Sequence, residues 1–360
     1  MKQYSATSLK QFTSQIFQKM GASKAQAELA AEVLNSADLR GVDSHGVARL
    51  SGYVRLWEKE RLNACPTPTI VHETPSTAVM DGDQGAGLMV APEAMNIAIE
   101  KAKIAGTGWV AIRNSNHYGI AGYHAMMALE HDMIGISMTN ASPLVSPTFS
   151  KSRLLGTNPI AVAIPALSEP PVVVDMATTP VANGKLEVQH RKGEDIPEGW
   201  AQTREGLSTT DAEALKKGGA MLPLGSDRTH GSHKGYCLGG MVDIFSAVLS
   251  GANYGPWVPP FVAFLEPPAQ QVGEGIGHFI GAMRIDAFRP AQEFKEHMDN
   301  WIKAFRSAEP VEPDQKVLVP GDPERALAHE RLKNGIPLLE PVVEDLTNLG
   351  EQMGVPFQNS

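Results

Sequence analysis

The feature that most constrains the fold of this 360-residue chain is a change of pattern near Thr77. From there on, short apolar runs with β-type residues alternate with longer runs of helical periodicity. Such alternation is typical of an α/β fold, in which helices cover a sheet. The runs that predict strands are residues 78–80, 109–112, 134–138, 161–164, 172–174, 261–265 and 279–285, and those that predict helices are the run after Pro92 and residues 123–130, 232–249 and 290–307.

Both ends of the chain have helical patterns. The N-terminal helices begin with matches to the capping box, and glycines follow each of them. A third helix is expected to begin at Asp43 or Ser44. The capping boxes are Ser8 with Gln11 and Ser23 with Gln26, and the glycines are Gly21 and Gly41.

The C-terminal part follows a proline-spaced stretch at residues 309–313. Asp322 as an N-cap, with Pro323 at the first helical position, predicts one helix, and another follows Pro341. We expect this tail to pack on the N-terminal helices. Residues 187–224 are polar and rich in glycine, so we expect a long segment here that extends away from the main α/β fold, an excursion from it.

Composition excludes several classes of protein. The net charge of -9, the pI near 5.7 and the lack of Lys/Arg runs argue against a nucleic-acid partner. Cys65 and Cys237 lie far apart and outside any zinc spacing, which favours a reducing cytoplasm over a disulfide framework. Residues 1–20 have no continuous apolar run and residues 236–252 contain Asp243, so we expect no signal peptide and no membrane span.

The octapeptide DSHGVARL at residues 43–50 is the first candidate for a functional site. If His45 and Arg49 share a helix face, the guanidinium can bind a carboxylate while the imidazole exchanges a proton with a neighbouring oxygen. Those two groups suit 2-hydroxy-acid or 2-keto-acid chemistry. The alternative is a helix whose His caps a neighbour and whose Arg is solvated.

A second histidine follows the strand predicted at 109–112. His117 lies in RNSNHYG, and strand ends are where α/β enzymes place catalytic groups. The Asn116 amide could fix the imidazole tautomer or bind a carbonyl, and Thr157 in GTNP supplies a hydroxyl before another strand. Ordinary polar turns are the alternative for both segments.

The glycine fingerprint of the doubly wound dinucleotide fold is absent, because Gly82, Gly85 and Gly87 have the wrong spacing. Three other segments could bind a cofactor phosphate. The strand at 172–174 runs into small and hydroxyl residues, Lys234 opens a helix at its positive end, and Gly321 precedes a further helix start.

Taken together, these segments resemble the malate/L-lactate dehydrogenase family, which is unrelated to the Rossmann-type lactate and malate dehydrogenases. The family also includes ureidoglycolate and sulfolactate dehydrogenases, diketogulonate reductase and piperideine-2-carboxylate reductase. The matching pieces occur in order and span most of the chain. They are DSHGVARL, RNSNHYGIAGYHA, LGTNPIAVAIP, VVDMATT, GKLE, IPEGWA, LPLG, HKGY, VLSGANYG and LVPG.

The resemblance implies a mixed-sheet α/β fold of non-classical Rossmann topology, with a cofactor-binding domain at 76–309 and a helical domain built from 1–75 and 310–360. It also implies an NAD(P)-dependent homodimer. The implied catalytic residues are His45, His117 and Arg49, with Ser44, Arg49, Asn116 and Thr157 at the substrate. The implied cofactor contacts are Val174, Asp175, Met176, Ala177, Thr178, Thr179, His233, Lys234, Gly321, Asp322 and Pro323.

We therefore expect an oxidoreductase that interconverts a small 2-hydroxy acid and a 2-keto acid by hydride transfer, with NAD as cofactor and NADP possible. Three alternatives stay open. One is reduction of a cyclic imine or a sugar-derived keto acid, or ureidoglycolate oxidation, and another is nucleotide binding without turnover. The third is a metal site at Asp227, His230 and His233, within and just after a polar insert at 226–231 that departs from the family.

Overall fold

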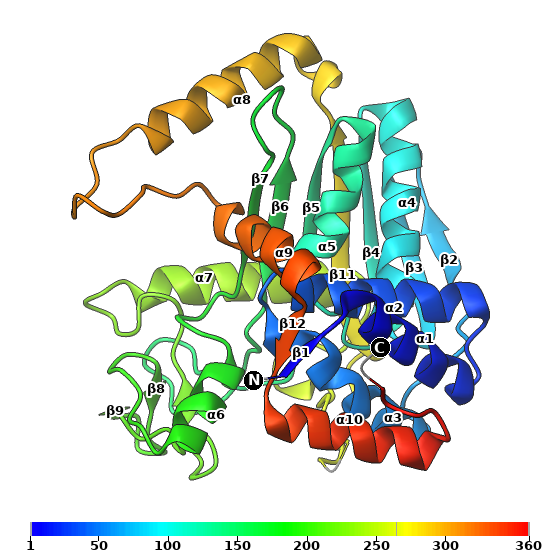
Figure 1. Ribbon diagram of the computed structural model, residues 1–360, viewed down its shortest axis with the longest axis vertical. Helices are drawn as coiled ribbons and strands as arrows, with labels where there is room; N and C mark the ends of the chain where they lie inside the picture. Colours follow the sequence, from blue (N-terminus) through cyan, green and yellow to red (C-terminus); the bar gives the residue numbers. More distant parts are fainter. Residues whose placement is uncertain (1, 264, 359–360) are drawn as a thin grey trace.

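A mixed sheet of seven strands forms the centre of the protein in the computed structural model, which describes residues 2–263 and 265–358 (Figure 1). Its presence confirms the α/β fold predicted from the alternating pattern. Across the sheet, the strands are β2 (Thr69–Glu73), β3 (Thr77–Gly85), β4 (Thr107–Ser115), β11 (Ile276–Arg284), β5 (Met133–Thr139), β6 (Ile160–Ile164) and β7 (Val172–Met176).

The strand directions bring several chain segments to one edge of the sheet. Only β3 and β4 pair in parallel, through the crossover helix α4 (Gly87–Ala105), and the other neighbouring strands pair antiparallel. It follows that β3, β4, β5 and β7 end at the same edge at which β6 and β11 begin. His117, Thr157 and Asp175 all belong to this edge.

Helices bury the apolar surfaces of the sheet. α4 and α5 (Ala121–Met126) share one hydrophobic core with the sheet, which includes Met95, Ile99, Val110 and Ile280. α7 (Ser232–Asp243) continues as a π-helical turn over Ile244–Val248, which lies against β4 and β11. α8 (Ala291–Arg306) lies at the outer end of the molecule in Figure 1.

The two ends of the chain pack together below the sheet in Figure 1. Residues Leu9, Phe17, Tyr53 and Leu346 belong to one buried core, as expected for a C-terminal tail that packs on the N-terminal helices. The domain boundaries at 75 and 310 remain a prediction. The elements here are β1 (Lys2–Tyr4) paired antiparallel with β12 (Ile336–Leu338), and the helices α1 (Ala6–Met20), α2 (Lys24–Leu39), α3 (Leu50–Glu58) and α10 (Glu340–Met353).

The predicted excursion has structure of its own. This segment begins within α6 (Asn183–Lys192) and packs around a small core that includes Val145, Leu186 and Met221. Three short strands pair within it. They are β8 (Ala201–Gln202), β9 (Ser208–Thr209) and β10 (Ala220–Met221).

Several predicted element ends differ in the structure. The first helix has Ser5, not Ser8, as its N-cap, and the Ser5 side chain accepts the Ser8 N–H; the capping box at Ser23 is confirmed. α4 begins before Pro92, because burial of the residues around the proline on several sides outweighs the lost backbone bond. The prediction of a strand at 261–265 is wrong for the described residues, which exclude residue 264. A turn lies there, in which the Leu265 N–H donates to the Val262 carbonyl at 3.1 Å.

Within residues 2–263 and 265–358, no helix combines the length and the apolar character needed to cross a bilayer.

Candidate active site

The octapeptide that carries His45 and Arg49 does not form the predicted helix start. Two 3₁₀ turns, Asp43–His45 and Val47–Arg49, precede α3, for which Arg49 is the N-cap. The shared helix face expected from the i, i+4 spacing is therefore wrong. Arg49 is instead folded back over the turn, because its Nε donates to the Ser44 carbonyl at 2.6 Å.

The two candidate histidines do meet, although 72 positions separate them in the sequence (117 minus 45). Their rings are stacked, with centroids 5.5 Å apart and an interplanar angle of 26°. His45 arrives on the 3₁₀ turn after α2, and His117 follows the end of β4. The Ser44 hydroxyl lies 2.9 Å from His45 Nδ1, which leaves Nε2 of that ring for a ligand.

Tyr53 is a site residue that the sequence reasoning missed. Its hydroxyl lies 2.6 Å from His117 Nδ1, and the Gly119 N–H approaches the same atom at 3.4 Å. An amide can only donate, so Nδ1 acts as an acceptor and the neutral His117 ring carries its proton on Nε2. Tyr53 stands four residues after Arg49, a helical spacing that could have suggested a shared face.

Phe261 completes one wall of the site. Its ring lies 4.7 Å from the His117 ring and 5.0 Å from the Tyr53 ring, centroid to centroid. The apolar run at 261–265 that predicted a strand includes this packing residue, which lies in irregular structure.

Both histidines are neutral at rest. Burial, and to a smaller extent the charge of Arg49, lower the pKa of His45 to about 4. Burial lowers the pKa of His117 well below its usual range, and His45 and Arg49 lower it further. Both residues are partly accessible to solvent. An anion bound beside Arg49 would oppose the effect of the guanidinium and raise both pKa values.

Arg49 is the cation best placed to bind that anion. Its Nε is occupied by the Ser44 carbonyl, and no described acidic residue forms an ion pair with its guanidinium. Its terminal nitrogens can therefore bind a carboxylate bidentately. Arg49 and Ser44 line a cavity of about 570 Å³, in which the other two arginines, Arg55 and Arg331, pair with Asp345 and Asp43.

Two further predicted substrate residues form backbone contacts. The Asn116 amide donates to the carbonyls of Gln84 at 2.8 Å and Arg61 at 3.3 Å. Thr157 lies across the same edge, where its carbonyl accepts both the N–H and the hydroxyl of Thr178. Asn116 thus supports the strand end that presents His117, and direct contact of either residue with substrate remains a prediction.

The predicted cofactor segment at the end of β7, residues 174–179, divides into an accessible and a buried part. Asp175 and Met176 are exposed, Val174 and Ala177 are partly so, and Thr178 and Thr179 are buried. The Asp175 carboxylate accepts the Gly122 N–H at 2.8 Å. Thr179 donates to the Val181 carbonyl at 2.7 Å. The accessible stretch 174–177 is the part that a ligand could touch.

The start of α7 carries the cation predicted there, Lys234, and Arg228 brings a second one next to His233, whose pKa is lowered by desolvation and by these two charges. His233 and Lys234 lie in its first turn, and Arg228 Nη1 lies 2.6 Å from His233 Nδ1. No described acidic residue pairs with Lys234 or Arg228. This concentration of cations at the positive end of a helix suits a phosphate.

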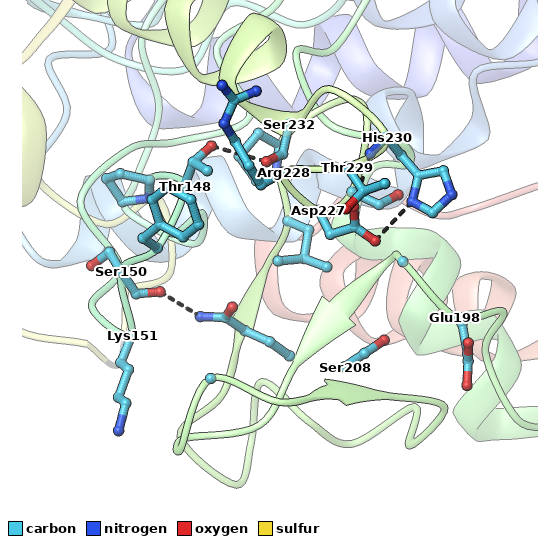
Figure 2. A pocket seen from close by; sticks show the side chains of 18 of the residues that line it. Thr148, Ser150, Lys151, Glu198, Ser208, Asp227, Arg228, Thr229, His230 and Ser232 are labelled. Atoms are coloured by element: carbon cyan, nitrogen blue, oxygen red, sulfur yellow. Dashed lines mark hydrogen bonds and ion pairs between the residues drawn. The ribbon is translucent and has the colours of Figure 1, made fainter.

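A separate cavity of about 750 Å³ lies beside this helix start, and Figure 2 shows its polar lining. Thr148 bonds to Ser232 at the base of α7, and Asp227 bonds to His230 at 2.7 Å. None of His45, Arg49 and His117 lines it. The histidine pair lies outside the lining of this cavity and of the cavity beside Arg49.

The third predicted cofactor segment packs beside β7. α9 (Asp322–Asn334) begins one residue earlier than predicted. Gly321, with φ of +96°, is its N-cap, and Asp322, which was the predicted N-cap, is the first helical residue. Pro323 follows within the first turn. The Asp322 carboxylate binds Arg306 and Arg325, so its side chain is held by protein groups. The Val173 N–H donates to the Pro320 carbonyl at 3.0 Å, which joins this turn to the sheet.

The residues considered as a metal site do not assemble in the described part of the chain. Within it, no group of three or more His, Cys, Asp or Glu side chains is close enough to hold an ion.

Comparison with known proteins gives consistent matches over nearly the whole chain. A family model described as malate/L-lactate dehydrogenase matches residues 4–347. The malate dehydrogenase of Pyrococcus horikoshii is 44% identical over 96% of this chain and 93% of its own length. A malate/(S)-sulfolactate dehydrogenase of Methanothermus fervidus is 40% identical over 94% and 95%. The crystal structure of malate dehydrogenase from Entamoeba histolytica aligns with a TM-score of 0.91 at 33% identity, covering 99% of both chains.

Proposed function

Because the chain belongs to the malate/L-lactate dehydrogenase family, and is thus an oxidoreductase for hydroxy acids, we propose that His45, His117 and Arg49 form its active site. The substrate is a small 2-hydroxy acid in one direction and the matching 2-keto acid in the other. The observation that carries this assignment is the stack of two neutral histidines beside an arginine without an acidic partner among the described residues.

Arg49 binds the carboxylate of the acid through its terminal nitrogens. A 2-keto acid has its carbonyl oxygen next to that carboxylate, so the oxygen falls within reach of a histidine Nε2 atom. When the carboxylate binds, its negative charge raises the pKa values of His45 and His117, and one imidazole takes up a proton. We expect substrate binding to be accompanied by proton uptake for this reason.

In the reducing direction, the charged imidazole gives its proton to the carbonyl oxygen as C2 receives a hydride. The bond between C2 and oxygen thereby becomes single, and the neutral histidine is restored. In the oxidising direction the hydroxyl proton goes to an imidazole whose Nε2 is unprotonated; His45 can adopt that tautomer, because its Nδ1 lies beside the Ser44 hydroxyl, whereas neutral His117 carries its proton on Nε2. General acid–base help of this kind contributes roughly 10² to 10⁴ in rate.

The residues present fit a nicotinamide dinucleotide. Lys234, His233 and the first turn of α7 suit its pyrophosphate, and the Asp175 carboxylate at the accessible end of β7 suits a ribose hydroxyl. The turn at Gly321, Asp322 and Pro323 would contact it through backbone groups. When bound, this cofactor supplies or accepts the hydride. We propose NAD as the cofactor, since a carboxylate at the ribose disfavours the extra phosphate of NADP.

Malate and oxaloacetate are the first substrates to test. Support comes from the relatives, which include malate dehydrogenases and a malate/(S)-sulfolactate dehydrogenase. All of these acids have a second anionic group.

The experiment records the nicotinamide absorbance with NADH or NADPH against oxaloacetate, pyruvate, a sulfonated keto acid and cyclic imino acids. We expect NADH oxidation with a keto acid, and loss of at least two orders of magnitude in kcat/KM in His45→Ala or His117→Ala. Undiminished turnover in both variants would refute the proposed site. NADH binding without turnover across the panel would instead favour a binding protein.

We also propose that the protein is a homodimer. Large apolar side chains stay exposed along α7 and its π-helical extension, on helically spaced positions. They are Tyr236, Ile244, Phe245, Val248 and Leu249. A second copy would cover them, and light scattering coupled to size exclusion should give twice the chain mass. A cytoplasmic location is proposed as well, supported by Cys65 and Cys237, which are both free.

A further inference from the structure

Asp38, near the end of α2, is a buried carboxyl that the proposed reaction does not use. Asp38 is only 1% exposed, and its Oδ2 accepts the Val47 N–H at 2.8 Å. Val47 lies between His45 and Arg49. The contact therefore holds the middle of the segment that carries both groups, residues 43–49, which we call the catalytic loop.

Gly46 shows how closely the catalytic loop rests on this carboxyl. A Cβ atom at residue 46 would fall 1.9 Å from Asp38 Oδ1 and 2.1 Å from its Cγ. The backbone φ of Gly46 is -92°, so the glycine is needed for the close approach and not for an unusual conformation. Asp38 and Gly46 together define where the loop turns.

Arg331, in the last turn of α9, holds the start of the same loop. Its guanidinium donates to the Asp38 carbonyl and to the Asp43 carboxylate, where the Nη2 to Oδ2 distance is 3.3 Å. The Arg331 side chain is 10% exposed, so its bond to the Asp38 carbonyl is shielded from water, whereas the Asp43 carboxylate is 55% exposed and meets solvent on its outer side. The loop is thus fixed at its start by Arg331 and at its centre by Asp38.

The charge state of Asp38 fits this role. Burial raises the pKa of the Asp38 carboxyl to about 8; the Val47 N–H lowers it, Asp43 raises it and Arg331 lowers it. The side chain is then mainly protonated at neutral pH, and one oxygen still accepts the Val47 N–H. Asparagine has the same shape and the same acceptor, so it should replace the protonated acid.

We propose that Asp38 and Arg331 are positioning residues that hold the catalytic loop where Arg49 and His45 face one substrate. The proposal rests on the proposed function for the identity of that substrate. Both residues border the cavity beside Arg49, but the Asp38 Oδ2 and the Arg331 terminal nitrogens are engaged by protein groups. They act through the loop and not on the reacting atoms.

The test compares Asp38→Ala, Asp38→Asn and Arg331→Met with a matched control, Asp299→Ala. Asp299 is also buried, and its carboxylate accepts the N–H groups of Leu167, Ser168 and Glu169 in another part of the fold. Five quantities are measured: kcat and KM for the keto acid, the NADH dissociation constant, the midpoint of thermal unfolding, and hydrogen exchange of residues 43–49.

We expect Asp38→Ala and Arg331→Met to lower kcat/KM by about 10²-fold, mainly through KM, because an ångström of misplacement costs that much. Exchange in the catalytic loop should accelerate, and NADH affinity should stay within about twofold of wild type, since no cofactor contact moves. Asp38→Asn should keep both loop protection and KM. Asp299→Ala should lower the unfolding midpoint and leave KM and loop exchange unchanged.

Three results would overturn the proposal: unchanged loop exchange in Asp38→Ala, an equal loss of kcat/KM in the Asp299 control, or an Asp38→Asn variant as impaired as Asp38→Ala. A raised KM in Arg331→Met with a fully protected loop would mean that Arg331 touches the substrate directly, which also contradicts it. If Asp38→Ala does not fold, Arg331→Met and Asp38→Asn decide the question. Hydrogen exchange needs no turnover, so failure of the proposed function leaves this test intact.

Discussion

Replacing Tyr53 by phenylalanine tests whether His117 needs its hydroxyl partner. The change removes one atom, which lies 2.6 Å from His117 Nδ1, and keeps the ring that packs against Phe17 and Phe261. The Gly119 N–H at 3.4 Å is then the remaining described donor to that nitrogen. His117 can turn or change tautomer, and its Nε2 no longer points reliably at the substrate.

The size of the effect follows from the lost hydrogen bond. Leaving a buried polar atom without a partner costs about 1 to 3 kcal/mol. If that free energy orients the imidazole in the transition state, kcat falls roughly 5- to 150-fold, since about 1.4 kcal/mol corresponds to a factor of ten. The unfolding free energy should fall by a similar amount.

Single-turnover oxidation of bound NADH, followed by stopped-flow absorbance, measures the chemical step. The matched control is Tyr118→Phe, because Tyr118 is also buried and its hydroxyl accepts from Ser137 at 3.2 Å and makes no described bond to His45, His117 or Arg49. We expect both variants to lose stability and only Tyr53→Phe to slow the chemical step. Equal slowing in both, or full activity in Tyr53→Phe, would refute the reasoning about His117.

Three further predictions can be checked with the same protein. Arg49→Lys keeps the charge but loses the bidentate geometry, so KM for the keto acid should rise by about tenfold or more while NADH affinity stays constant in a fluorescence titration; an unchanged KM would exclude Arg49 from the carboxylate. The pKa of His45 is 6.5 in an unfolded chain and about 4 when folded, so the unfolded state binds more protons between these values; the contribution of His45 to the unfolding free energy should be constant above pH 6.5 and fall as the pH drops toward 4, and His45→Gln should remove this contribution, measured as the difference from wild type in denaturant titrations. Lys234→Met should weaken NADH binding by about 1.5 to 3 kcal/mol, the usual range for a hydrogen bond to a charged group, and the loss should shrink at high salt; salt-independent weakening would argue against a phosphate contact.

Much of the sheet could be predicted from sequence, because its strands are short apolar runs whose pattern is local. The edge where the site forms can be predicted from the rule that functional residues lie at the ends of strands. That rule points to His117 after β4 and to the residues at the end of β7. The absence of a glycine fingerprint also agrees with the antiparallel pairing of most strands.

The local shape of the catalytic loop could not be predicted in this way. Its periodicity is helical, but the Val47 N–H bonds to Asp38 and the helix begins only at Leu50. The roles of Tyr53 and Phe261 depend on contacts with His117 that join distant parts of the chain. An apolar run such as 261–265 has the same composition whether it forms a strand or packs against a catalytic ring.

The pairing of the chain ends bears on how the protein is made. His45 and Arg49 leave the ribosome early, yet Arg331, which holds their loop, and β12, which pairs with β1, follow almost three hundred residues later. Until then the apolar faces of α1 and α3 lack part of their cover, and exposed faces of that kind favour aggregation during synthesis. The substrate site should therefore be among the last parts to mature, and the nascent chain a natural client for chaperones.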